Sequence, residues 1–359
     1  MIDADVPGDK TSSFEAALPS ADSNVATFAR DDRAIGHVAK NFLRRFPTTI
    51  PALVLIAGIL GFGLIAPNFL TPGTLALVIQ QVTVIGIVAI AQTVIILTAG
   101  IDLSVGEIMV FSAVIMGNLA VYDGWPLSAA LLAGFAVAGA MGAFNGVLVA
   151  YVRLPAFIVT LGTLGMYRAI KLWYTQAESV RAVDIDNNAP GLLFFGYSWK
   201  FLGADVTAGG VALIILAVVV WYMLNRTPWG RHVHAIGDDE DSAMLSGINT
   251  RKTIVSVYAF AGLICGFAAW ISIGRVGSAA PIGFETLNLD SITAVVIGGT
   301  SLFGGRGSIV GSVLGTLIVG VFSTGLTLAG VDDYWQLFAT GGLVIAAVAL
   351  DQWLRRSSQ

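Results

Sequence analysis

Residues 75–98 read LALVIQQVTVIGIVAIAQTVIILT and contain no charged side chain. A helix of this length rises about 36 Å, which is enough to cross the roughly 30 Å hydrocarbon core of a bilayer. The whole chain of 359 residues has the same character, with 56% apolar residues, 12% charged residues, 42 glycines and a mean hydropathy of +0.81. This composition excludes a disordered chain, a disulfide scaffold, an ordinary soluble enzyme and a nucleic-acid binder. It predicts a polytopic helical membrane protein.

Apolar runs along the chain predict an all-α bundle of about ten membrane-spanning segments. The runs lie near 48–67, 75–98, 104–121, 127–150, 155–174, 206–224, 253–275, 290–300, 309–328 and 335–352. The eighth run is short, so we expect a half-span or a re-entrant element there.

The polar regions suggest how the chain is oriented. Residues 1–46 and 354–359 are predicted cytoplasmic tails, the first of them disordered, on either side of a transmembrane domain over 47–353. Residues 1–46 lack the apolar core of a signal peptide. With that tail inside, 14 of the 19 Lys and Arg residues fall on the cytoplasmic side, as the positive-inside rule favours. The sequence therefore predicts cytoplasmic termini, a long inner loop at 225–252 and a long outer loop near 175–205.

Local signals mark the starts and the packing of several spans. Pro72 and Pro155 are expected at first helical positions, and Asp290 and Ser308 are expected to cap the eighth and ninth elements. Close helix packing is predicted at three GxxxG pairs, which are Gly142/Gly146, Gly262/Gly266 and Gly311/Gly315.

Asp102 lies at the break between the second and third predicted spans. An ionisable group at membrane depth costs about 2.5 kcal/mol or more unless it is satisfied. Two interpretations are open: Asp102 bonds the free backbone amides at the start of the third span, or it is a hinge or pathway group. Ser104 and Glu107 form a capping-box pattern, which is an alternative to a pathway role for Glu107.

The sequence contains no recognisable catalytic set. It has no Gly-Lys pair, so it lacks a phosphate-binding P-loop. His232 and His234 are two residues apart and Cys265 is the single cysteine, which is poor spacing for a metal site. We therefore expect a non-enzymatic chain with no metal and no cofactor, driven by an ion gradient or by a partner protein.

The inner loop at 225–252 contains a predicted short helix. Asp238 is placed to cap it, and Gly247 is placed to end it after about eight residues. The helix would carry Ala243, Met244 and Leu245, a composition that suits insertion into a groove on a cytosolic partner. The alternative is an interfacial helix that rests on lipid.

Four blocks along the chain carry a family pattern. They are GIDLSVG at 100–106, LPAFIVTLGT at 154–163, AIGDDEDSAMLSGI at 235–248 and AVVIGGTSLFGGRGS at 294–308. In this order they resemble segments of the permease subunits of ATP-binding-cassette (ABC) importers of the ribose, galactoside and fructose class, and the fructose type in particular. The resemblance covers about 45–352.

The resemblance implies a multi-pass permease subunit of the bacterial inner membrane that dimerises with a second copy of itself amid membrane lipid. It implies a monosaccharide delivered by an extracytoplasmic sugar-binding protein and a cytoplasmic ATP-binding subunit that hydrolyses the ATP. By the same resemblance, the ATPase-coupling residues are Gly237, Asp238, Asp239, Glu240, Ala243, Met244, Leu245 and Gly247. This segment is more acidic than the family pattern, and Met244 stands where a basic residue is frequent.

Polar residues inside the spans are the candidates for the translocation pathway or hinge. They are Asp102, Ser104, Asn145, Gln81 and Gln92. Amides at such positions can bond sugar hydroxyls or neighbouring helices. The alternative function is a gradient-driven secondary transporter or channel with Asp102 as its ion site, which would need no ATPase.

Overall fold

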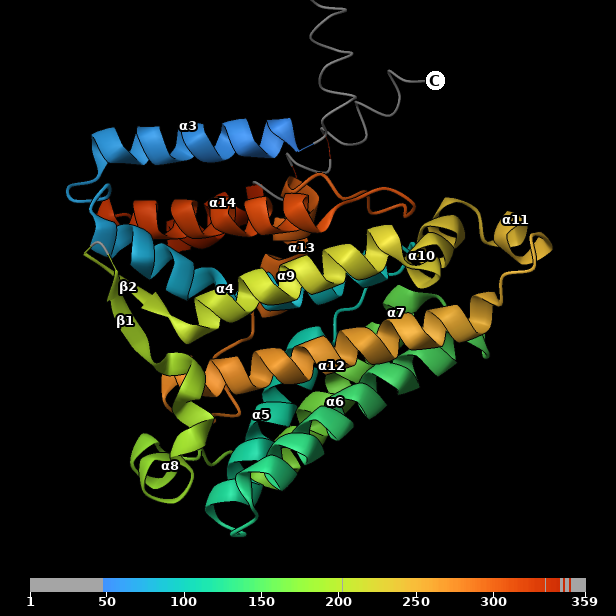
Figure 1. Cartoon of the computed structure of the whole chain (residues 1–359), viewed down its shortest axis with the longest axis horizontal. Coiled ribbons are helices and arrows are strands. Elements are labelled where there is room, and N and C mark those ends of the chain that lie inside the picture. Colours follow the sequence, from blue (N-terminus) through green and yellow to red (C-terminus); the bar gives the residue numbers. More distant parts are fainter. Residues whose placement is uncertain (1–47, 202, 333, 343–344, 346–348, 350–359) are drawn as a thin grey trace, which may run out of the picture. The chain divides into compact units, whose positions relative to one another are not determined.

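The computed structural model describes residues 48–201, 203–332 and 334–342, together with 345 and 349. The predicted tails at 1–46 and 354–359 lie outside the described residues, as does most of 343–352. The described part is mainly helical and contains one antiparallel pair of short strands (Figure 1). The predicted all-α class is confirmed.

The elements follow one another in chain order. They are α3 (Thr49–Ile65), α4 (Pro72–Ile96), α5 (Val105–Val121), α6 (Leu127–Ala150), α7 (Ala156–Thr175), α8 (Ala182–Asn188), the 3₁₀ helix η1 (Pro190–Gly196), β1 (Ser198–Phe201), β2 (Ala204–Thr207), α9 (Ala208–Arg226), α10 (Pro228–Asp238), α11 (Glu240–Leu245), α12 (Thr250–Val276), α13 (Leu287–Ile297) and α14 (Ile309–Leu328).

Each of the first nine predicted spans contains a helix. Among the described residues, α4, α6, α9, α12 and α14 are long and apolar enough to cross a membrane, and α3, α5 and α13 are shorter apolar helices. α13 has 11 residues and rises about 16 Å, roughly half the hydrocarbon thickness. The expected short eighth element is therefore confirmed. A further helix over 334–342 lies at the start of the tenth predicted span.

Helix starts follow the sequence signals in part. Thr71 accepts a hydrogen bond from the amide of Thr74 with Pro72 at the first helical position, and Ser308 accepts from Gly311, as expected. Asp290 is not a cap: α13 begins at Leu287, and the Thr286 hydroxyl donates to Asp290 Oδ2 at 2.9 Å. Pro155 stands one position before the first helical residue of α7.

The buried centre of the bundle consists of α4 and α12, which pack against each other and against most of the other long helices. α6 lies along α12 in Figure 1. A methyl group at Gly142 would meet the backbone carbonyl of Tyr258, and one at Gly262 would meet that of Ala138. The glycines therefore allow the two backbones to touch, and the close packing predicted for these pairs is confirmed. On α14, methyl groups at Gly311 and Gly315 would likewise meet the backbone carbonyls of Gly298, at the end of α13, and of Ala294.

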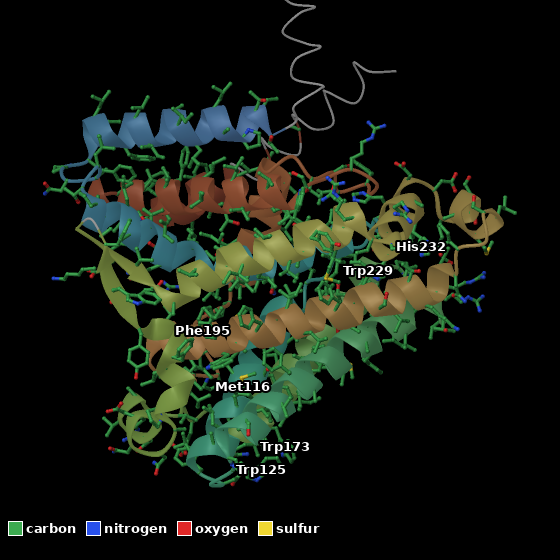
Figure 2. The ribbon with its side chains drawn as sticks, in the orientation of Figure 1. Met116, Trp125, Trp173, Phe195, Trp229 and His232 are labelled. Atoms are coloured by element: carbon green, nitrogen blue, oxygen red, sulfur yellow. The ribbon has the colours of Figure 1, made fainter. Side chains whose placement is uncertain are left out.

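The predicted long loop near 175–205 contains α8, η1 and the β1–β2 hairpin, in which Ser198 pairs with Thr207. Phe195 of η1, labelled in Figure 2, meets Trp270 of α12 edge-on with 4.8 Å between ring centroids. These short elements escaped prediction because each is too short to show a hydrophobic period. They cover the end of the bundle opposite α10 and α11 (Figure 1).

Candidate functional site

The segment between α4 and α5 turns back into the bundle around Asp102. This side chain is 1% exposed. Its Oδ1 atom accepts hydrogen bonds from the amide of Ser104 at 2.7 Å and from the hydroxyl of Ser104 at 2.6 Å. Asp102 therefore bonds backbone at the start of the third span, which is the first of the two interpretations of this residue.

A polar network extends from this break into α6 and α7. The Nδ2 atom of Asn145 donates to Ser104 Oγ at 2.8 Å and lies 3.4 Å from Asp102 Oδ2. The hydroxyl of Tyr167 donates to Asn145 Oδ1 at 3.2 Å. The hydroxyl of Thr160 donates to the carbonyl of Ile101 at 3.0 Å. The network thus fastens the break to two neighbouring helices.

Gln92 of α4 completes the network. With its amide oriented to satisfy both groups, it donates to the carbonyl of Asp102 and accepts from the amide of Asp102, each at 3.2 Å. Four of the five pathway candidates, Asp102, Ser104, Asn145 and Gln92, therefore meet in one place. Gln81 does not join them, because its Oε1 atom accepts from the hydroxyl of Thr324 at 3.0 Å, between α4 and α14.

The predicted capping box is wrong. The hydroxyl of Ser104 bonds Asp102 and Asn145 instead of an amide of α5. Glu107 forms ion pairs with two cations of α7, Lys171 at 2.6 Å and Arg168 at 3.3 Å. The two cations of α7 thus bind the carboxylate that the sequence pattern assigned to the cap.

The Glu107 ion pair borders a cavity that the sequence did not reveal. The side chains of Glu107 and Lys171 are 9% and 5% exposed, and that of Arg168 is 48% exposed. Asn288 of α13 also lines the cavity and accepts a hydrogen bond from the amide of Gly106 at 2.7 Å through its Oδ1 atom. The sequence signal for this site was a carboxylate and two cations within apolar runs. The carboxylate lies more than sixty residues from the cations in the chain, so the sequence did not indicate that they pair.

The inner loop forms two helices instead of the single predicted helix capped by Asp238. Asp238 is the last residue of α10, and Asp239 is the N-cap of α11, where its Oδ1 atom accepts from the amide of Ser242 at 3.0 Å. This hydrogen bond lowers the pKa of Asp239. α10 begins at Pro228, a favoured first helical residue. α11 has six residues and rises about 9 Å.

The predicted end of this helix is confirmed. Gly247 has a φ of 85°, which a glycine adopts without strain. The amide of Gly247 donates to the carbonyl of Met244, and the amide of Ile248 donates to the carbonyl of Ala243. This pair of hydrogen bonds is the Schellman arrangement. Ala243 is buried, whereas Met244 and Leu245 are 54% and 86% exposed. α11 therefore presents two large apolar side chains on a well-defined turn.

α10 is joined to the α4–α5 break through backbone atoms. Gly237 packs against the carbonyl of Leu97 and the amide of Gly305, and the amide of Gly305 donates to that same carbonyl at 3.1 Å. His234 Nδ1 lies 3.1 Å from the carbonyl of Gly305. We call the contact of Gly237, Leu97 and Gly305 the backbone joint.

A second contact holds α10 on α12. Trp229, labelled in Figure 2, donates from Nε1 to the hydroxyl of Ser256 at 2.9 Å. Its ring also meets Phe260 edge-on, with 5.6 Å between centroids. α10 is thus fixed to the bundle on two sides, whereas α11 extends beyond it.

Comparisons with known proteins identify the class of chain. Residues 74–348 match the family described as "Branched-chain amino acid transport system / permease component". The chain belongs to this family. It is 46% identical over 344 residues to the fructose import permease protein FrcC of Rhizobium meliloti, which covers 96% of both chains. It is 37% identical to the ribose import permease protein RbsC of Bacillus subtilis (84% of this chain, 89% of the relative). It is 38% identical to the D-allose transport system permease protein AlsC of Escherichia coli (82% and 88%). No solved structure matches.

The four sequence blocks of this permease component meet in space. The block at 100–106 forms the break, and that at 154–163 bonds it through Thr160. The blocks at 235–248 and 294–308 meet at the backbone joint, next to Leu97. The arrangement suits the transmission of movement from α11 to the bundle.

Proposed function

We propose that this chain is the membrane-spanning permease subunit of an ATP-driven importer for a monosaccharide, of the fructose type. The relatives named for fructose, ribose and allose support a sugar as the cargo. The chain is not an enzyme and needs no cofactor, since a separate cytoplasmic ATP-binding subunit hydrolyses the ATP. The observation that carries the proposal is the backbone joint between α10 and the α4–α5 break.

The end of the bundle with α10 and α11 faces the cytoplasm in this proposal, with both termini on the same side of the bacterial inner membrane. The distribution of Lys and Arg supports it. The opposite end, with α8 and the β1–β2 hairpin, then receives the sugar from an extracytoplasmic binding protein. Membrane lipid surrounds the apolar faces, and a second copy of the chain completes the pathway. Nucleic acid has no part in this assembly.

The ATP-binding subunit binds α11 at the two exposed apolar side chains of that helix, Met244 and Leu245. When the ATP-binding subunits close, α11 and α10 move together, because only Asp239 separates them. The movement reaches Leu97 through Gly237 and then the Asp102 network. That network holds one of two arrangements of the bundle, and ATP binding shifts the balance between them.

The contacts of Asp102 argue against the gradient-driven alternative. Its carboxylate already accepts from the amide and hydroxyl of Ser104, and Asn145 stands at its other oxygen. A cation site would need these oxygens to face an open space. The relatives also support the importer over a gradient-driven carrier.

Substitution of Gly237 tests the proposal. In Gly237→Ala the new methyl group meets backbone atoms of Leu97 and Gly305 that cannot rotate away. Overpacking of this kind costs about 1–3 kcal/mol. In proteoliposomes that contain the ATP-binding subunit and the binding protein, we expect sugar uptake per ATP hydrolysed to fall about tenfold. The subunits should still co-purify, because α11 is unchanged.

The matched control is Gly162→Ala on α7, where an added methyl group meets open space. It should transport normally. Normal coupling in Gly237→Ala would contradict the role of the backbone joint. Uptake by the permease without any ATP-binding subunit, driven by an ion gradient, would contradict the importer itself.

A further inference from the structure

The cavity beside Glu107 lies where three segments converge. They are the first turns of α5, the C-terminal half of α7, and the stretch that leads from Pro281 into α13. Two helices, α5 and α13, begin at this cavity. The lining residues are Gly106, Glu107, Val110, Arg168, Lys171, Leu172, Pro281, Ile282, Gly283, Phe284, Glu285 and Asn288.

The charges that line the cavity balance. Two carboxylates, Glu107 and Glu285, face two cations, Arg168 and Lys171. The amide of Gly283 bonds Glu285 and lowers the pKa of that carboxyl, and both cations act in the same direction. The cavity therefore offers charged hydrogen-bonding groups without a net charge, which gives an anion or a cation little advantage over a neutral solute.

Asn288 supplies an unused donor at the wall of the cavity. Its side chain is buried, with the residue 8% exposed, and its Oδ1 atom is taken by the amide of Gly106. Its Nδ2 atom makes no hydrogen bond to another described residue. Among the described residues this nitrogen is not one of the fully enclosed polar atoms that lack a partner, so it is accessible and can donate to a ligand or to water in the cavity. The terminal nitrogens of Arg168 likewise bond no other described residue.

Donors and acceptors therefore stand side by side, next to the ring of Phe284. Each hydroxyl of a sugar both donates and accepts, and the C–H face of a sugar ring is apolar. A neutral polyol can use all three features, whereas an acid or an amine would leave part of the charge unbalanced. We propose that this cavity binds the transported sugar, an inference that rests on the proposed import function.

The position of the cavity links binding to coupling. Gly106 and Glu107 belong to the first turn of α5, which follows directly on Ser104, and Ser104 is bonded to Asp102 and Asn145. A movement of the break therefore moves one wall of the cavity. The sugar would be released when that wall shifts.

Thiol labelling under protection by sugar tests the site. The native Cys265 is buried, so the unsubstituted chain gives the background. In the assembled importer in proteoliposomes, Phe284→Cys and Asn288→Cys are treated with a small water-soluble thiol reagent. With D-fructose at ten times its dissociation constant, we expect labelling of both to slow about tenfold, because the free fraction of sites falls to about one eleventh.

Leu289→Cys is the matched control, since Leu289 is adjacent to Asn288, exposed and not part of the lining. Its labelling should not respond to D-fructose. Sodium gluconate, an acidic polyol, should protect none of the three. Uptake of D-fructose by the unsubstituted importer is measured in the same vesicles.

If the importer takes up D-fructose and D-fructose protects Phe284→Cys and Asn288→Cys from labelling, the result supports the site. Uptake without protection of either overturns it and leaves the importer standing. Protection by gluconate alone also overturns the assignment of a neutral polyol. Failure of the unsubstituted importer to take up D-fructose or D-ribose overturns the proposed function, and this inference with it.

Discussion

Asp102 and Glu107 are acidic residues five positions apart, and both are nearly buried, yet their surroundings differ. Asp102 is enclosed by neutral donors of the chain itself, the amide and hydroxyl of Ser104 and the amide of Asn145. Glu107 is paired with two cations and borders a cavity. Burial alone therefore does not identify a pathway residue. The useful distinction is whether the partners of a carboxylate close the space around it or leave it open.

The largest expected effect comes from the ion pair. Glu107→Gln leaves the ammonium group of Lys171 buried without its nearest carboxylate, and Lys171→Met removes the closest cation from Glu107. Breaking a buried pair on one side costs about 3–5 kcal/mol in the free energy of unfolding. The double variant should be more stable than the sum of the two losses indicates, as measured by thermal unfolding of the purified protein.

Arg168→Gln is the control for this cycle, because the Arg168 side chain is about half exposed. Its loss should stay below about 1 kcal/mol. Strictly additive losses in the double variant would mean that Glu107 and Lys171 do not act as a pair.

A smaller effect is expected at Asp102. Asp102→Ala leaves the buried amide and hydroxyl of Ser104 without an acceptor, which costs about 1–3 kcal/mol in the free energy of unfolding. Asp102→Asn keeps an oxygen for these donors and should cost less than about 1 kcal/mol. Sugar uptake by Asp102→Asn should remain within about twofold of the unsubstituted importer, because the charge itself has no cation partner in the network.

The two Asp102 variants test whether Asp102 and Glu107 really differ in role. If Asp102→Asn unfolds at the normal temperature but loses uptake, the carboxylate charge serves the pathway and Asp102 resembles Glu107 after all.

The smallest effect is expected at an exposed acid, Asp239. The backbone amide of Ser242 lowers its folded pKa below the ordinary 3.8. A carboxyl of this kind stabilises α11 fully above its unfolded pKa, and the contribution is lost only as the pH falls through the folded value. Between pH 7 and pH 5, co-purification of the ATP-binding subunit should therefore not change through Asp239. The ratio of retention by the unsubstituted chain to that by Asp239→Asn should be constant over this range. A ratio that falls toward pH 5 would contradict this assignment.

The spans could be predicted because each is an uninterrupted apolar run, and a bilayer leaves few other options for such a run. The helix end at Gly247 could be predicted for a similar reason, since its conformation is fixed by local bonds. The start of α5 could not. Its Ser-x-x-Glu pattern is sound locally, but Asp102 and Asn145 compete for the hydroxyl of Ser104.

The part of the candidate site at the α4–α5 break could be predicted from the sequence. The part that depends on which helices pack together could not. Asp102 stood out as a charge at membrane depth. The partners of Glu107 belong to α7, and Asn288 belongs to α13, so their meeting is a property of the packed bundle. The separation of α10 from α11 was missed because either of two adjacent aspartates could act as the cap, and only the extended backbone at Asp239 decides between them.

The backbone joint has a consequence for how such importers diversify. Its contacts are made by the main chain of Gly237, Leu97 and Gly305, so its shape does not depend on the side chains of α11. In the function proposed above, the acids and apolar groups of α11 can then vary to bind different ATP-binding subunits while the backbone joint keeps its dimensions. In that function, the surface that selects the partner, α11, and the contact that transmits its movement, the backbone joint, can evolve separately.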